Sequence, residues 1–132
     1  MTELLSDGPY KEKYRKQMIQ WSDEVRAKDY GFFCREASKV LKKEIVIVSD
    51  IRRQNDIRWF RDTFQNKVKL IRIKCEDHIR IDRGWKFEDG IDNIQSECDL
   101  DDFNEWNLEI ENDGLKNTEQ ILDEIQKIIS LD

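Results

Sequence analysis

The sequence contains few of the residues that build metal centres or disulfide frameworks. Its 132 residues include one histidine, His78, and three widely spaced cysteines, Cys34, Cys75 and Cys98. Structural zinc sites need a cluster of such ligands, and a disulfide framework needs an even set of cysteines at suitable spacings. Neither a zinc centre nor a disulfide scaffold is therefore expected, and we predict that the three cysteines are reduced structural thiols.

Long apolar runs are also missing. No apolar stretch approaches the ~20 residues that a membrane-spanning helix requires. The N-terminus has no basic flank followed by an apolar stretch, which is the pattern of a secretory signal. We therefore expect a cytosolic protein that does not bind membranes.

A phosphate-binding loop of the Gly-x-x-x-x-Gly-Lys type is absent as well. Such a loop needs a glycine followed by lysine. The five glycines precede Pro9, Phe32, Trp85, Ile91 and Leu115. A protein with these residues must bind phosphate in another way or obtain the loop from elsewhere.

The composition suits one globular domain with a densely charged surface. Apolar residues make up 38% of the chain and charged residues 39%, with a net charge of -6. An acidic balance argues against general binding to nucleic acid or anionic membrane. Local clusters of basic residues inside an acidic protein instead suit a small phosphorylated ligand.

The pattern of apolar residues predicts an α/β protein with a parallel sheet. The run at 44–49 is rich in β-branched residues without polar alternation, which is typical of a strand buried on both faces. Further elements are expected as strands at 67–73 and 108–111, and as helices at 10–28, 32–43, 56–64 and 118–131. Residues 76–105 form a lid-like and acidic loop region, and the whole chain, 1–132, reads as a single domain.

Three charged residues follow the predicted strand at 44–49. Ligands of α/β sheets gather at the carboxyl ends of the strands, where Asp50, Arg52 and Arg53 are expected to lie. Guanidinium groups bind phosphate oxygens in a fork-like manner, although two solvated surface arginines are the alternative. Asp50 suits a carboxylate that holds a magnesium shell through water, or alternatively one that caps a turn.

Other basic residues occupy positions suited to a cleft. Lys11, Arg15 and Arg26 lie beside the apolar stripe of the first predicted helix. Arg35 lies near the start of the second predicted helix, where a cation opposes the helix dipole. Arg80 and Arg83 resemble arginines of a mobile lid over nucleotide phosphates. A salt-bridged exposed helix is the alternative for that pair.

Many short motifs, in order along the chain, make the sequence similar to animal-type phosphomevalonate kinases. They are Tyr10-Lys11-Glu12, Arg15-Lys16, Met18-Ile19, Gly31-Phe32-Phe33-Cys34-Arg35, Val48-Ser49-Asp50, Arg52-Arg53, Asp56-Ile57, Trp59-Phe60-Arg61, Arg83-Gly84-Trp85, Ser96-Glu97-Cys98 and Ile110-Glu111-Asn112. The resemblance implies a P-loop nucleoside-monophosphate-kinase-like fold with a three-layer parallel sheet. It also implies transfer of the γ-phosphoryl group of MgATP to 5-phosphomevalonate, in the mevalonate route to isoprenoids and sterols. ATP and Mg²⁺ are the expected cofactors and a monomer the expected state.

The resemblance also assigns roles to individual residues. It implies that Arg52 stabilises the transferring phosphoryl group and that Arg53 and Arg26 bind phosphomevalonate. The remaining expected ligands are Lys11, Arg15, Arg35 and Asn112 on the substrate side and Arg80 and Arg83 on ATP. Asp113 and Leu122 stand where the family's nucleotide-contacting polar residues are expected, and so depart from its pattern.

The chain also departs from the family at its start. The resemblance begins downstream of the family's first strand, phosphate loop and helix, and that strand is central in the fold. We therefore expect an N-terminally incomplete kinase domain with weak or no activity of its own. The alternative is a non-catalytic fragment of the same fold that binds a phosphorylated ligand or a partner.

Overall fold

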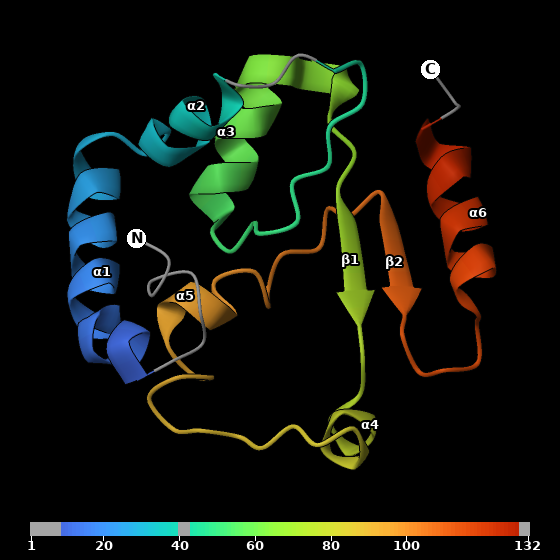
Figure 1. The fold of residues 1–132 in the computed structure, drawn as a ribbon. Helices are drawn as coiled ribbons and strands as arrows, with labels where there is room; N and C mark the ends of the chain where they lie inside the picture. The colour runs from blue at the N-terminus through green and yellow to red at the C-terminus, as the bar shows by residue number, and fades with distance from the viewer. Residues whose placement is uncertain (1–8, 40–42, 130–132) are drawn as a thin grey trace. The chain divides into compact units, whose positions relative to one another are not determined.

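The computed structural model describes residues 9–39 and 43–129, with side chains from Lys13 onward. The chain divides into two compact units, Met1–Phe60 and Arg61–Asp132, which are described separately below. Figure 1 shows their helices and strands in chain order. Within the described residues, no helix is both long enough and apolar enough to cross a bilayer.

The first unit is built from three helices: α1 (Pro9–Lys28), α2 (Phe32–Ser38) and α3 (Gln54–Phe64), whose last turn belongs to the second unit. Proline is well suited to the first position of α1, because its missing N–H would have no helical partner there. Between α1 and α2, the Asp29 carboxylate accepts the backbone N–H of Gly31 at 3.2 Å. The predicted helices at 10–28 and 56–64 are confirmed. The helix predicted at 32–43 ends at Ser38, and residues 40–42 lie outside the described part.

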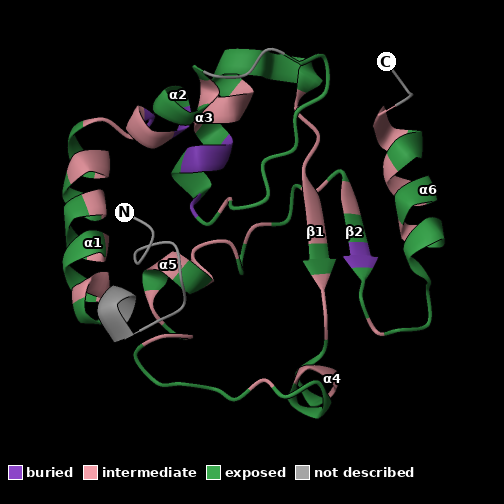
Figure 2. Cartoon of the chain, viewed as in Figure 1, coloured by how far each residue is buried: buried purple, intermediate pink, exposed green. Residues whose placement is uncertain are grey.

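The buried residues of this unit lie where α2 meets the first turns of α3 (Figure 2). Among the described residues they are Gly31, Cys34, Arg53, Asp56 and Ile57, a mixture of apolar and charged residues. Gly31 allows a close approach, since a Cβ there would lie 2.0 Å from Cδ1 of Trp59. Ala37 and Phe64, although apolar, are exposed. Cys34 and Asp56 fill the contact instead.

The strand predicted at 44–49 does not form in this structure. Ile45, Val46, Ile47 and Val48 are all exposed and follow an irregular course, and Ile47 is 84% exposed. A strand is stabilised by hydrogen bonds and side-chain contacts with a neighbouring strand. Among the described residues, this segment pairs with no strand, so its β-branched side chains remain in water.

The second unit is organised around two parallel strands, β1 (Ile71–Lys74) and β2 (Leu108–Glu111), with Ile73 opposite Ile110. Figure 1 shows the two arrows side by side, with α6 (Thr118–Ile129) next to β2. Ile110 is 0% exposed and forms the centre of this core. The predicted strand at 108–111 is confirmed, and the predicted closing helix at 118–131 is confirmed over Thr118–Ile129.

The strand predicted at 67–73 begins later than expected. A 3-10 turn, η2 (Gln65–Lys67), follows α3, with Gln65 at a φ of 53°. The strand pairing is extended at Leu70, whose N–H donates to the Asn107 side chain at 2.7 Å and whose carbonyl accepts from the Asn107 N–H at 2.8 Å. The turn includes Lys67, the first residue that the sequence pattern assigned to the strand.

A long connection joins the two strands, as parallel pairing requires. It contains two short helices, α4 (Asp77–Asp82) and α5 (Gln95–Cys98), within the predicted loop region 76–105. The α/β class is therefore confirmed. The sheet has two strands over the described residues, and the larger three-layer kinase sheet remains a prediction.

Candidate functional site

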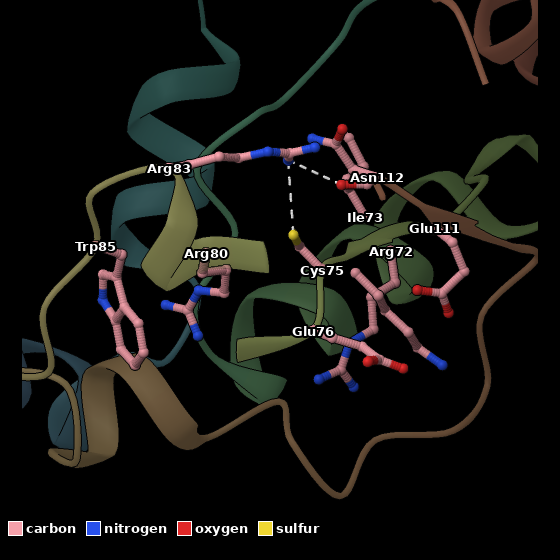
Figure 3. A pocket seen from close by; sticks show the side chains of 10 residues that line it. Arg72, Ile73, Cys75, Glu76, Arg80, Arg83, Trp85, Glu111 and Asn112 are labelled. Atoms are coloured by element: carbon pink, nitrogen blue, oxygen red, sulfur yellow. Dashed lines mark hydrogen bonds between the residues drawn. The ribbon is translucent and has the colours of Figure 1, made fainter. Parts of the chain in front are cut away.

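A groove of ≈ 780 Å³ opens at the carboxyl ends of the two strands in the second unit. This is the edge of a parallel sheet at which ligands usually bind. Figure 3 shows the side chains that surround it. The lining residues are Arg72, Ile73, Lys74, Cys75, Glu76, Arg80, Arg83, Trp85, Glu111 and Asn112.

Arg83 joins the residues that follow the two strands. Its Nη1 donates to the carbonyl oxygen of Asn112, after β2, at 2.8 Å, and to Sγ of Cys75, after β1, at 3.6 Å (Figure 3). Gly84, the next residue, has a φ of +96°, which suits glycine and turns the chain away from α4. Arg83 therefore connects the α4 segment to the ligand-binding edge of the sheet.

Arg80 is held by two neighbours in the same groove. Its Nη1 lies 3.0 Å from Oδ1 of Asp77, and its guanidinium carbon lies 3.8 Å from the centre of the Trp85 ring. Stacking of a cation on an indole restricts the side chain while leaving edge N–H groups available to a ligand. Arg80 is thus preorganised to bind an anion.

Two further cations at the groove have structural partners. Lys74 forms an ion pair with Glu109 on the neighbouring strand. Arg72 donates to the Leu100 carbonyl at 3.1 Å and lies 5.6 Å from the centre of the Trp106 ring. The Lys74 pair links the two strands, and the Arg72 contacts hold the connection against β1.

A second candidate site is a cluster of alternating charges in the first unit. Helix α1 contributes Asp23 and Arg26, and the start of α3 contributes Arg53 and Asp56. Arg53 Nη2 donates to Asp23 Oδ1 at 2.7 Å, while Arg26 Nε lies 3.7 Å from Asp56 Oδ1. The four side chains, which we call the crossed-pair cluster, bring together two arginines that are 27 positions apart in the sequence.

The thiol of Cys34 adds a neutral donor to this cluster. Its Sγ donates to Asp56 Oδ1 at 3.4 Å. Burial, and next the charge of Asp56, raise the pKa of the Cys34 thiol to about 12. Cys34 is therefore a protonated structural group here and not a nucleophile.

Arg26 keeps an unused donor. Its Nε is buried and has no hydrogen-bond partner among the described residues, and its guanidinium lies 4.6 Å from the centre of the Phe33 ring. A buried N–H without an acceptor costs about 1–3 kcal/mol.

Two comparisons with known proteins bear on these sites. The sequence model of the phosphomevalonate kinase family matches residues 1–66. The chain belongs to the phosphomevalonate kinase family. A curated relative named phosphomevalonate kinase, from Drosophila melanogaster, is 55% identical over 105 residues, which cover 76% of this chain and 56% of that protein. The chain therefore spans little more than half the length of that relative, and the resemblance read from its motifs is confirmed.

The structure brings some of the family's expected site residues together. Arg26 and Arg53 each pair with a carboxylate of the crossed-pair cluster, and Arg80, Arg83 and Asn112 line the groove. At Asn112, the contact is made by its backbone carbonyl, which accepts from Arg83. The structure does not choose between a lid over nucleotide phosphates and a salt-bridged exposed helix as the setting of Arg80 and Arg83. Arg80 pairs with Asp77 on helix α4, and it also lines the groove.

Other expected site residues lie apart from these two groups. Arg35 pairs with Asp29, and this hydrogen bond lowers the pKa of the Asp29 carboxyl. Arg52 Nε lies 2.7 Å from Oδ1 of Asp50, and both side chains are exposed on the irregular segment before α3. Arg15 is half-buried on α1. The side chain of Lys11 lies outside the described part.

The fit of a metal ion rests on the Asp50 carboxylate. No group of three or more histidine, cysteine or acidic side chains that could hold a metal ion occurs among the residues described. Mg²⁺ commonly uses one or two carboxylates together with substrate phosphates and water, so a single carboxylate is chemically suitable. Asp50 would hold such an ion, and the ion would neutralise charge on ATP phosphates.

Sequence reasoning missed three residues of these sites. Asp23 and Asp56 hold Arg53 and Arg26, and Trp85 holds Arg80. Asp23 and Arg26 are three positions apart on α1, a spacing that places them on one face and could have indicated a shared site. No comparable signal in the sequence pairs Asp56 with Arg26 across 30 residues.

Proposed function

We propose that this chain carries the substrate-binding part of a phosphomevalonate kinase. In the reaction, a bond forms between an oxygen of the 5-phosphate of phosphomevalonate and the γ-phosphorus of ATP, while the bond from that phosphorus to the bridging oxygen of ADP breaks. The products are 5-diphosphomevalonate and ADP. The observation that carries this proposal is the similarity to the Drosophila protein named phosphomevalonate kinase. We expect this reaction to belong to the cytosolic mevalonate route. We also expect the chain to act as a monomer and to be part of a single kinase domain.

The charges of the two sites support a phosphorylated ligand. The crossed-pair cluster holds Arg26 and Arg53, and the groove holds Arg80 stacked on Trp85. Phosphoryl transfer depends mainly on positioning and charge neutralisation, and arginine is well suited to both. A protein with one histidine can catalyse such a reaction without a general base.

We assign roles according to this chemistry. Arg52 would stabilise the transferring group, and Asp50 would hold Mg²⁺ through water. Arg26 and Arg53 would bind the phosphate of phosphomevalonate, with Lys11, Arg15 and Arg35 as further ligands from the first unit. The family resemblance also gives Asn112, in the second unit, a substrate role. Arg80 and Arg83 would bind ATP phosphates from the groove.

We expect little or no turnover from residues 1–132 alone. These residues contain no glycine–lysine phosphate loop, whose lysine and backbone donors stabilise charge in related transfers. One such donor is often worth about 3 kcal/mol of transition-state stabilisation. This same observation favours the second candidate, a non-catalytic protein that binds phosphomevalonate or docks a partner.

Calorimetry and a coupled assay of ADP release test the proposal. We expect 5-phosphomevalonate to bind the chain without ATP, and ADP release to be close to background; rapid turnover would exclude the second candidate. In an active enzyme that carries these residues, Arg52→Ala should lower kcat more than it raises KM. Arg58→Ala, a matched change at an exposed arginine on α3, should leave both values near those of the wild type. An unchanged kcat in Arg52→Ala would refute the role of Arg52.

A further inference from the structure

The two ion pairs of the crossed-pair cluster differ in exposure. The side chains of Asp56 and Arg53 are 6% and 9% exposed, whereas that of Asp23 is 47% exposed. The Asp56 backbone N–H is also fixed by the carbonyl of Arg53 at 3.0 Å. Asp56 is thus held inside the unit, while Asp23 covers the guanidinium of Arg53 from the solvent side.

The cluster is electrically neutral as it stands. Two arginines face two carboxylates, so a phosphate group of charge about −1.5 to −2 would meet two like charges if nothing moved. A half-exposed carboxylate regains hydration when it leaves its partner, and exposed ion pairs contribute little stability. A buried carboxylate such as Asp56 has no comparable compensation. Asp23 is therefore the member of the cluster that can leave at low cost.

We propose that Asp23 is an exchangeable partner of Arg53. In the free protein, Asp23 accepts the hydrogen bond from Arg53 Nη2 and keeps the guanidinium oriented. When 5-phosphomevalonate binds, a phosphate oxygen takes the place of the Asp23 carboxylate, and Asp56 stays beside Arg26. Asp23 thus competes with the substrate for Arg53. This inference rests on the proposed function, because it takes Arg53 as a substrate ligand.

The test compares three variants of the 132-residue chain by calorimetry with 5-phosphomevalonate. Asp23→Asn removes the competing charge, Asp23→Glu keeps it, and Glu24→Gln removes a charge from the same helix turn. Glu24 is a matched control, since its carboxylate accepts from Gln20 at 3.1 Å. Mevalonate, which lacks the phosphate, serves as a control ligand, and thermal melting confirms that each variant is folded.

We expect Asp23→Asn to lower the Kd for 5-phosphomevalonate about two- to five-fold, as the loss of one exposed competing ion pair allows. Asp23→Glu and Glu24→Gln should bind as the wild type does, and affinity for mevalonate should not change in any variant. If the wild type binds 5-phosphomevalonate and Asp23→Asn binds it equally or more weakly, Asp23 does not compete with the substrate for Arg53. That result would overturn this inference and leave the proposed function standing. A wild type that does not bind 5-phosphomevalonate would overturn both.

Discussion

Because the thiol of Cys34 is buried, we expect the stability of the folded chain to fall at alkaline pH. In the folded protein, burial and the neighbouring Asp56 charge raise the pKa of Cys34 from 9.0 to about 12. Between these values, the unfolded chain loses the thiol proton while the folded chain retains it. The contribution of the protonated thiol to the free energy of unfolding is therefore fully present below pH 9 and is lost as pH rises toward 12. Since one pH unit corresponds to about 1.4 kcal/mol, the loss from this group should be about 1.4 kcal/mol at pH 10.

Replacing Cys34 by serine isolates this effect, because the hydroxyl can still donate to Asp56 but does not ionise in this range. We would measure urea unfolding by tryptophan fluorescence at pH 8 and pH 10. The fall in unfolding free energy between the two should be about 1.4 kcal/mol smaller in Cys34→Ser than in the wild type. Cys34→Ala should show the same flattening but lower stability at both pH values, because it leaves Asp56 without this donor. Parallel pH profiles in wild type and Cys34→Ser would refute the reasoning.

Two further predictions concern how far apolar side chains are buried. Ile110→Ala should destabilise the chain by about 2–5 kcal/mol in urea unfolding, whereas Ile73→Ala, at the position opposite it on β1 and 62% exposed, should cost less than about 1 kcal/mol. Equal costs would contradict the burial that the structure assigns to β2. Ile47→Lys should change the unfolding free energy by less than about 0.5 kcal/mol, because Ile47 is exposed, and a loss above about 2 kcal/mol would show that the residue is buried in the folded chain.

Local patterns were sufficient to predict most helices and the strand at 108–111. The apolar spacing in α6 and the turn that follows β2 are features of neighbouring residues, so a single sequence contains them. The start of β1 could not be read in this way, since it depends on a side-chain contact from Asn107, 37 residues away from Leu70. Long-range contacts of this kind leave no periodic signal.

The sequence pointed to the arginines of the candidate sites but not to the groups that hold them. Arg26, Arg53, Arg80 and Arg83 follow from motifs and from positions near the ends of elements. The partner of Arg53 lies on α1, 30 residues before it, and the partner of Arg26 lies on α3. Such pairing joins residues about 30 positions apart, so a sequence read locally gives the charges without their partners.

The segment Ile45–Val48 shows the limit of composition as a predictor of structure. β-branched residues favour a strand because they pack well on a pleated surface, and this preference is realised only when neighbouring strands supply that surface. Here the side chains are exposed and the backbone is irregular. The two arginines that follow nevertheless differ in environment, since Arg53 is buried against α1 while Arg52 is exposed with Asp50. Arg53 is therefore buried and paired with Asp23 of α1 in a structure where the predicted strand does not form.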